Sequence, residues 1–306
     1  MTATAERALE WLEGALAERL EAKELEWWNR TREEVAEGVT PTRFSLLLSS
    51  ASRWVKKRPL APADAARASA GEILEGWNPE RWSAREAARV GFVLSRYDLD
   101  EEGGAAAIED AFRFSDESEA VALYRSLAFL PHAERYVWRA GEGCRSNMLS
   151  VFEAVALDTP FPFANFDDAT FDQAAIKAIF VGAPLWRLYG LDRRLTPKLA
   201  GMALDLADER RSAHREVQAD LWLTLGSHGG DRGLASIEQE LDSGSTLGRS
   251  AAALALARAG RRDDLAARLE RETDDVVAGF MRGALEGRHT QAVFGELQAA
   301  LTPANT

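Results

Sequence analysis

Three aspartates lie close together in the stretch NFDDATFDQ, residues 165–173. Asp167, Asp168 and Asp172 follow the spacing D-D-x-x-x-D, and on a helix the last two would share one face because they are four residues apart. Carboxylate oxygens are hard ligands that suit Mg²⁺, and a bound diphosphate would complete its octahedral shell. This first trio is therefore a candidate magnesium site.

A second polar trio occurs later in the chain, in the stretch DERRSAHRE, where Asp208, Ser212 and Glu216 are four residues apart. Together the two trios are typical of a Mg²⁺-dependent lyase or cyclase acting on a prenyl or other diphosphate, with Arg193 or Arg194 against the diphosphate. In known cyclases the motifs lie much farther apart in sequence, and this second trio falls on a polar helix stripe. Under this alternative Mg²⁺ is the cofactor, and the sequence indicates no other. The residues expected to take part in catalysis would be Asp168, Asp172, Arg193 and Arg210.

A structural role for the first trio competes with the metal site. Asp172 shares its helix face with the apolar Ile179, and burying an unpaired carboxylate is costly. We therefore expect Asp172 to meet Arg210, or a neighbouring arginine, in a buried ion pair that fixes the helix register. Asp167 and Asp168 would then be acids of the first turn that interact favourably with the helix dipole. We favour this structural interpretation and keep the magnesium site as the alternative.

Two further groups of residues are candidate ligand contacts. Arg145 and Asn147 lie at an expected helix start, where free backbone donors favour an anion. The competing interpretation is that Ser146 caps that helix and Arg145 is a surface charge. Phe163 belongs to the aromatic stretch DTPFPFANF, which either lines a hydrophobic ligand pocket or packs a long loop onto the helices.

The composition limits the classes of partner. The 306 residues carry 37 Lys and Arg against 49 Asp and Glu, a net charge of −12, which disfavours nucleic acid and anionic lipid. Cys144 is the single cysteine, so neither an internal disulfide nor a cysteine-rich metal site is expected. The first twenty residues lack the apolar core of a signal peptide, and no uncharged run is long enough to span a membrane. We expect a cytoplasmic protein.

Helical periodicity extends through the chain, whereas the two-residue alternation of strands is nearly absent. Proline and glycine clusters mark the ends of the segments, and Thr196-Pro197 is a good helix start. The predicted helices are 5–36, 41–56, 63–75, 83–97, 103–114, 117–129, 133–140, 146–157, 168–181, 196–216, 218–225, 230–242, 246–259, 262–272, 274–286 and 289–300. We predict an all-α fold of short antiparallel helix pairs.

The last part of the chain has a repeated plan. Residues 233–260 are expected to form a helix, a turn and an alanine-rich helix, and residues 263–287 repeat that plan. This pattern is typical of stacked HEAT-like repeats, which build an α-solenoid. We therefore divide the chain into a helical domain, 1–228, and HEAT-like repeats, 229–306, which could continue the same solenoid.

Several stretches of the chain resemble the EboA family. They include RFSLLLSSASRW, GWNPERWSAREAARV and, in order, RSNM, VFEAVA, FPFANF, IKAIFVGAPL and GLDRR. Each piece alone is weak, but their order is specific, and the resemblance covers roughly residues 40–225. Two positions depart from the family pattern: Asp172 stands where an asparagine is expected, and Asp208 stands where a histidine is expected.

The resemblance implies an all-helical protein of a secondary-metabolite pathway. Family members come from bacterial and algal operons that also encode a UbiA-type prenyltransferase, and in cyanobacteria these operons are linked to precursors of the pigment scytonemin. The resemblance assigns no chemistry to this component. We therefore predict a protein that binds a pathway intermediate or a partner enzyme on a concave face, with the diphosphate cyclase or lyase as the alternative.

Overall fold

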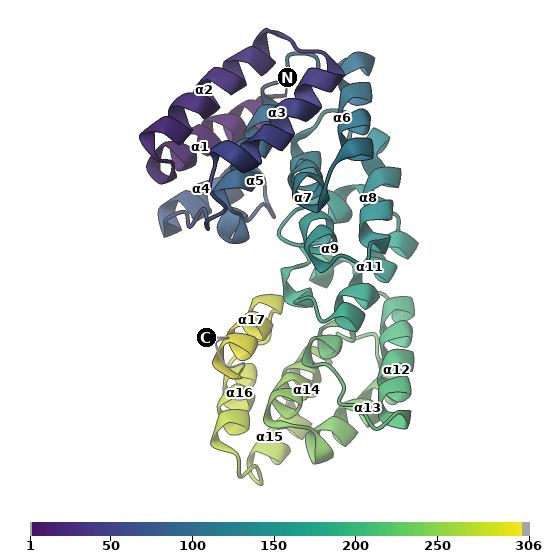
Figure 1. Ribbon diagram of the computed structural model, residues 1–306. Helices are drawn as coiled ribbons and strands as arrows, with labels where there is room; N and C mark the ends of the chain where they lie inside the picture. Colours follow the sequence, from purple (N-terminus) through teal and green to yellow (C-terminus); the bar gives the residue numbers. More distant parts are fainter. Residues whose placement is uncertain (1, 302–306) are drawn as a thin grey trace. The chain divides into compact units, whose positions relative to one another are not determined.

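The computed structural model describes residues 2–301. Within that range helices follow one another, and the extended pairing consists of one isolated antiparallel bridge between Pro59 and Ser83 (Figure 1). The predicted all-α class is therefore confirmed. The internal contacts divide the chain into two compact units, Met1–Phe166 and Asp167–Thr306, which we call unit 1 and unit 2.

Unit 1 contains ten α-helices and three short 3₁₀ helices among its described residues. The α-helices are α1 (Ala3–Arg19), α2 (Ala22–Glu37), α3 (Pro41–Trp54), α4 (Asp64–Ile73), α5 (Ala84–Leu94), α6 (Glu102–Phe114), α7 (Glu117–Ser126), α8 (Val137–Arg145), α9 (Leu149–Ala156) and α10 (Phe161–Asn165). The 3₁₀ helices are η1 (Pro79–Arg81), η2 (Leu127–Phe129) and η3 (Ala133–Tyr136). The central helix is α5, which packs against α1, α2, α3 and α7.

The long helix predicted over 5–36 is wrong, because the chain breaks between α1 and α2. Leu20 adopts an extended conformation and is buried, while Glu21 begins α2 with a reciprocal capping box to Glu24. The Glu24 carboxylate also accepts hydrogen bonds from the backbone N–H of Lys56 and from Arg58. The break thus depends on contacts to a distant loop, which local periodicity does not report.

Unit 2 contains seven α-helices and three 3₁₀ helices in its described part. The α-helices are α11 (Asp168–Val181), α12 (Pro197–Ser212), α13 (Gly230–Ser243), α14 (Thr246–Arg258), α15 (Arg262–Leu269), α16 (Asp275–Leu285) and α17 (Gln291–Leu301). The 3₁₀ helices are η4 (Leu185–Arg187), η5 (Leu191–Arg193) and η6 (Ala219–Thr224), the last of which replaces the helix predicted over 218–225.

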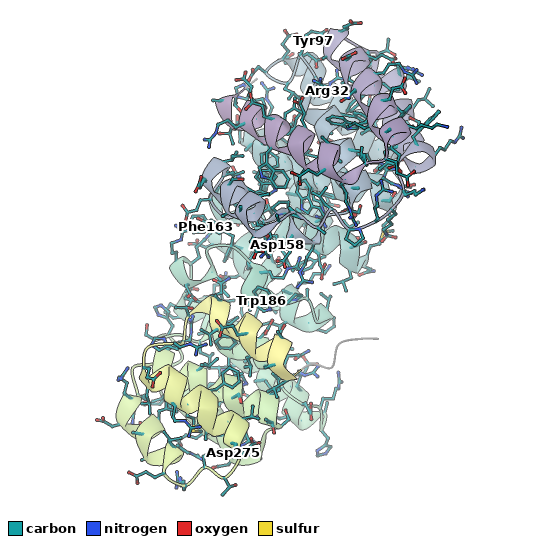
Figure 2. All side chains as sticks on the ribbon, turned by 90° about the vertical axis from the view of Figure 1, so that its left-hand side faces the viewer. Arg32, Tyr97, Asp158, Phe163, Trp186 and Asp275 are labelled. Carbon is teal, nitrogen blue, oxygen red and sulfur yellow. The ribbon has the colours of Figure 1, made fainter. Side chains whose placement is uncertain are left out.

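Helix α14 forms the centre of unit 2. Nine of its residues are buried, and it packs against α13, α15, α16, α17 and η6. Its many alanines let these neighbours approach closely, since a small side chain keeps the helix axes near each other. Figure 2 shows Trp186 of η4 beside the yellow C-terminal helix α17, to which its indole is hydrogen-bonded.

The contacts divide the chain at Phe166 rather than near residue 228. Helices α12 and η6, which precede residue 228, pack on α13 and α14, which follow it. The helix–turn–helix pairs expected in the tail are present as α13–α14 and α15–α16, and the members of each pair are in contact. A solenoid of HEAT-like repeats and a domain boundary at 228/229 stay predictions.

Across residues 2–301, every helix is too short or too polar to cross a bilayer.

Candidate functional site

The first two acids of the candidate trio lie at the start of α11. Asp167 is the N-cap residue, and its Oδ1 accepts from the backbone N–H of Thr170 at 2.8 Å. Hydrogen bonds from Thr170 lower the pKa of Asp167. The exposed Asp168 accepts from Nη2 of Arg194 at 2.6 Å, and that guanidinium stacks over the ring of Phe171. Both acids thus lie where the structural interpretation placed them, at the helix N-terminus.

The third acid, Asp172, is only 1% exposed, which confirms its predicted burial. Burial raises its pKa, and its Oδ2 has no hydrogen-bond partner in the described part of the chain. The predicted ion pair with Arg210 is wrong: Arg210 lies in the last turn of α12 and donates from Nε to the backbone carbonyl of Glu216. A side chain at a helix end can reach past the last turn, so its guanidinium turns to the following loop instead of the helix seam.

The second trio has separate partners. Asp208 pairs with Arg232 at 2.6 Å, whereas the Ser212 hydroxyl donates to the carbonyl of Glu209 at 2.8 Å. Glu216 is exposed in the loop after α12. Among residues 2–301, no three His, Cys, Asp or Glu side chains converge closely enough to hold a metal ion. The geometry therefore gives no support to a magnesium site made from either trio.

The remaining sequence candidates lie apart from these acids in the chain. Arg193, in η5 of unit 2, stacks over the ring of Tyr189 with 4.8 Å from its Cζ to the ring centroid. In unit 1, Arg145 is exposed and pairs with Glu142 of its own helix. Asn147 is also exposed.

The helix start predicted near Ser146 is shifted in the structure. Ser146 is the C-cap residue of α8, and its hydroxyl accepts from the backbone N–H of Met148 at 3.1 Å. Helix α9 begins at Leu149 without a side-chain cap. The chain therefore uses Ser146 to shape the turn between two helices rather than to start the second. The half-buried Phe163 lies in the short helix α10.

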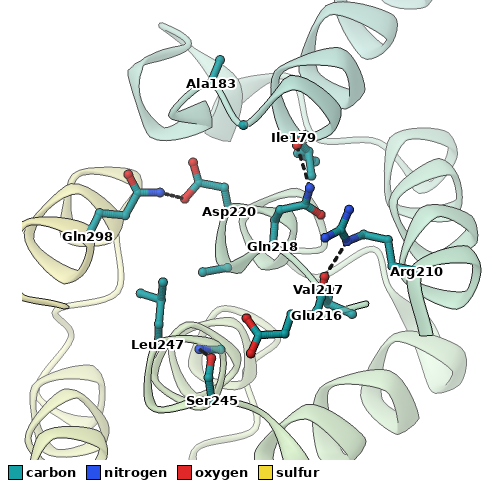
Figure 3. A pocket seen from close by; sticks show the side chains of 13 residues that line it. Ile179, Ala183, Arg210, Glu216, Val217, Gln218, Asp220, Ser245, Leu247 and Gln298 are labelled. Atoms are coloured by element: carbon teal, nitrogen blue, oxygen red, sulfur yellow. Dashed lines mark hydrogen bonds between the residues drawn. The ribbon is translucent and has the colours of Figure 1, made fainter. Parts of the chain in front are cut away.

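A cavity of about 380 Å³ lies in unit 2 (Figure 3). Its wall is formed by the ends of α11 and α12, the segment 216–220, the first turn of α14, and α17. The lining residues are Ile179, Gly182, Ala183, Arg210, Glu216, Val217, Gln218, Ala219, Asp220, Ser245, Leu247, Gly248 and Gln298. The cavity combines aliphatic side chains with a guanidinium, two carboxylates and two amides.

Asp220 is the buried carboxylate of this wall and is 5% exposed. Its Oδ2 accepts from the backbone N–H of Leu185 at 2.6 Å, and its Oδ1 accepts from Nε2 of Gln298. A further backbone hydrogen bond comes from Trp186. Burial raises the pKa of Asp220 to about 6, although these hydrogen bonds oppose the rise. The carboxylate therefore binds protein groups on two elements, η4 and α17.

Gln218 presents an acceptor that no protein donor satisfies. Its Nε2 donates to the carbonyl of Ile179 at 3.1 Å, which fixes the orientation of the amide. Its Oε1 is buried and has no partner among the described residues. The terminal nitrogens of Arg210 also make no hydrogen bond within residues 2–301, since only its Nε is used. The terminal nitrogens of Arg210 thus remain as donors for a bound molecule, and the Gln218 oxygen remains an unsatisfied acceptor enclosed in the wall.

Sequence reasoning missed Gln218, Asp220 and Gln298. One local signal was present, because Asp220 is the only charged residue in the run VQADLWLTL. A charged residue inside an apolar run is costly to bury and therefore points to a specific partner. Gln298 gave no such signal, since it lies 78 residues away from Asp220 in the chain.

Cavities of about 350, 410 and 340 Å³ also occur, two in unit 1 and one in unit 2. The second of these lies between α3 and α6 and is lined mainly by apolar and hydroxyl side chains. None of these three is lined by a buried side-chain polar atom that lacks a partner, as judged over the described residues. The cavity with Gln218 is therefore the strongest candidate site.

One family model matches the chain. It is described as "Metabolite traffic protein EboA" and covers residues 8–226, which confirms the resemblance recognised over 40–225 and extends it toward the N-terminus. No curated protein and no solved structure matches the chain. The matched segment supplies Arg210, Gln218 and Asp220 to the cavity, whereas α14 and α17 lie beyond it.

Proposed function

Because the chain belongs to the EboA family of metabolite traffic proteins, we propose that it binds a small polar metabolite in the cavity of unit 2 and hands it on unchanged. The metabolite would be an intermediate of a secondary-metabolite pathway, as the family resemblance implies. The observation that carries this proposal is the buried, unpartnered Oε1 of Gln218. A buried acceptor without a donor costs roughly 1–3 kcal/mol, and a ligand hydroxyl or N–H would recover that free energy.

The size and chemistry of the cavity support this proposal. A volume of about 380 Å³ falls within the range of small-molecule sites, roughly 300–1,000 Å³. Figure 3 shows Gln218 and Arg210 close to each other on one side of the cavity, with Leu247 among the aliphatic residues that complete the wall. A ligand with one donor and one acceptor group would satisfy both polar side chains.

The hydrogen bonds that occupy the carboxylate of Asp220 favour a role in binding over one in catalysis. A general base must have its carboxylate within reach of a substrate proton. The Asp220 oxygens are instead engaged by the N–H of Leu185 and the amide of Gln298. The hydroxyl of Ser245, another lining residue, accepts from the N–H of Gly248 as the cap of α14.

A binding screen tests this proposal. Hydroxylated and amine-bearing metabolites, with and without a carboxylate or phosphate, are added to the purified chain in thermal-shift and calorimetric titrations. The hit is then titrated against Gln218→Met, which keeps the side-chain length and removes the acceptor. We expect about fivefold weaker binding, since one hydrogen bond contributes about 1 kcal/mol. Gln239→Met, on the exposed face of α13, is the matched control and should bind normally.

Two outcomes would contradict the proposal. Equal affinity of Gln218→Met and the parent chain would place the ligand elsewhere. Mg²⁺-dependent release of diphosphate from geranyl, farnesyl or geranylgeranyl diphosphate, lost in a folded Asp172→Asn variant, would favour the cyclase alternative.

A further inference from the structure

Helix α17 is a wall of the cavity that comes from outside the family-matched segment. It contributes Gln298 to the lining and packs on α14, η4 and η6. Its apolar anchors are Val293, Phe294 and Leu297, which are all buried. Residues 286–290 join α17 to α16.

Hydrogen bonds fasten α17 to η4 and η6. Gln298 accepts from Nε1 of Trp186 at 3.0 Å and donates to Asp220. At the other end of the helix, Nε2 of Gln291 donates to the carbonyls of Trp186 and Leu188, both at 2.7 Å. We call Asp220, Gln298, Trp186 and Gln291 the polar clasp. Water can replace each of these hydrogen bonds when the helix leaves, so the clasp is weaker than an apolar seam of the same area.

The packing of α17 against η4 also depends on a close fit between a tryptophan ring and a glycine. The ring of Trp186 lies against the backbone of α17 at Gly295, where an added Cβ would come within 3.0 Å of Cδ2 and Cε3 of the ring. The glycine permits this approach, and it also weakens the helix by roughly 0.5–1 kcal/mol relative to alanine. The glycine therefore lets α17 sit directly against the ring of Trp186 at a cost to the helix itself.

We propose that α17 is a releasable wall of the cavity, that Gln298 is the positioning residue that holds this wall, and that the cavity widens to pass the metabolite when the polar clasp opens. The identity of what passes rests on the proposed function, whereas the release of α17 is a property of the chain alone. Release must break the polar clasp and also expose Val293, Phe294 and Leu297, so we expect α17 to open as one cooperative unit. The tail beyond the family-matched segment thereby controls access to a site built largely by that segment.

Asp220 is the titratable group of the polar clasp, and the charged side chains on the neighbouring elements have other partners. The groups that donate to its carboxylate, the backbone N–H of Leu185 and of Trp186 and the amide of Gln298, are uncharged, and the charged Arg210 and Glu216 line the same cavity. On the packed elements, Arg258 of α14 pairs with Asp192. Glu296 of α17 pairs with Arg288, and the carbonyl of His289 accepts from Arg258. The protonation of Asp220 is therefore linked to its exposure to water, and hence to the position of α17.

Hydrogen exchange of the full chain without ligand tests the release directly. Peptides covering residues 291–301 should exchange at least tenfold faster than those of α14, and Gln298→Ala should raise that rate about tenfold more. Gln291→Ala, which cuts the other end of the clasp and keeps the cavity wall, should act in the same direction. Gln239→Ala on the exposed face of α13 is the control and should change nothing. The proposal would be overturned if α17 exchanged at the same rate as α14 and if neither Gln298→Ala nor Gln291→Ala changed that rate.

Cysteine labelling links release to access. Ala183→Cys lines the cavity and Ala255→Cys lies in the core of α14 away from the cavity, and both parent alanines are buried. The thiol at 183 should react with a disulfide reagent at the opening rate of α17 and faster in Gln298→Ala, while the thiol at 255 should not follow. The parent chain, with only the native Cys144, sets the background. If the thiol at 183 is labelled rapidly while α17 stays protected from hydrogen exchange, the reagent enters by another route and α17 is not the wall that opens. Since neither measurement uses a ligand, failure of metabolite binding would leave both results standing.

Discussion

Two side chains with buried polar atoms, one in each unit, are treated in opposite ways by the fold. Arg89 in α5 of unit 1 is 0% exposed and donates to the carbonyl of Leu48 and to the hydroxyls of Ser118 and Ser52, at 2.8–2.9 Å. Gln218 in unit 2 has one satisfied donor and one buried oxygen without a partner. A fully satisfied group holds elements together, whereas an incompletely satisfied group beside a cavity has capacity left for a ligand.

The largest expected effect is the loss of the satisfied group. Arg89→Met would remove the donor to the carbonyl of Leu48 and to the hydroxyls of Ser118 and Ser52, and it would leave the buried Glu119 without its guanidinium partner. We expect the free energy of unfolding to fall by about 3–5 kcal/mol, as for other broken buried networks. Urea denaturation would measure this, with Arg113→Met as the control because that arginine is 71% exposed and only loosely paired. A loss below about 1 kcal/mol would mean that the hydrogen bonds of Arg89 contribute little.

An intermediate effect concerns pH and the clasp. The pKa of Asp220 is raised to about 6 by burial, so the docked state of α17 binds a proton more tightly than a released state in which Asp220 is hydrated. Docking is therefore most favourable below the ordinary pKa of an aspartate and is progressively lost up to pH 6. Release should increase by at most tenfold for each pH unit in that window and level off above it.

Hydrogen exchange of residues 291–301, corrected for the intrinsic pH dependence of exchange, would report this change between pH 4.5 and 7.5. Asp220→Asn should flatten the profile, because an amide does not titrate. If the exchange rate of residues 291–301 in the parent chain does not change with pH, the titration of Asp220 does not control the release of α17. The same conclusion follows if the Asp220→Asn variant keeps the pH dependence of the parent chain.

The smallest effect is expected for the unsatisfied group itself. Gln218→Met without ligand should change the free energy of unfolding by less than about 1 kcal/mol. The variant removes an unpaired oxygen, and the carbonyl of Ile179 keeps a hydrogen bond from the N–H of Gly182. Thermal and urea unfolding would measure this. A loss as large as that of Arg89→Met would show that Gln218 supports the fold rather than a ligand.

Some elements followed directly from the sequence and others could not. The bounds of α11 agree with the prediction because Asp167 caps its start and Gly182, with φ +72°, ends it in the left-handed region. Helix α12 likewise begins at Pro197 after the Thr196 cap. These signals lie within the helix ends themselves, so periodicity and capping rules are sufficient to find them.

The cavity lay beyond such rules because its parts come from distant segments. Periodicity assigns a residue to a helix face, but it does not say which face it meets, and Asp220 and Gln298 could not be joined on that basis. The same limit explains the incorrect partner of Arg210, whose side chain reached past the end of α12 to Glu216. The burial of Asp172 was predicted correctly because it depends only on its own helix face.

The fluorescence of Trp186 should report the release of α17 without an added label. Of the nine tryptophans, only Trp186 and Trp222 belong to unit 2, and Trp222 lies in its interior with no exposed surface. When α17 leaves, Trp186 exchanges a helix backbone and an amide for water, and its emission should move to longer wavelength while that of Trp222 stays constant. The seven tryptophans of unit 1 and Trp222 would give a constant background, so the change in emission after a pH jump in stopped flow would give the time constant of opening before any ligand is known.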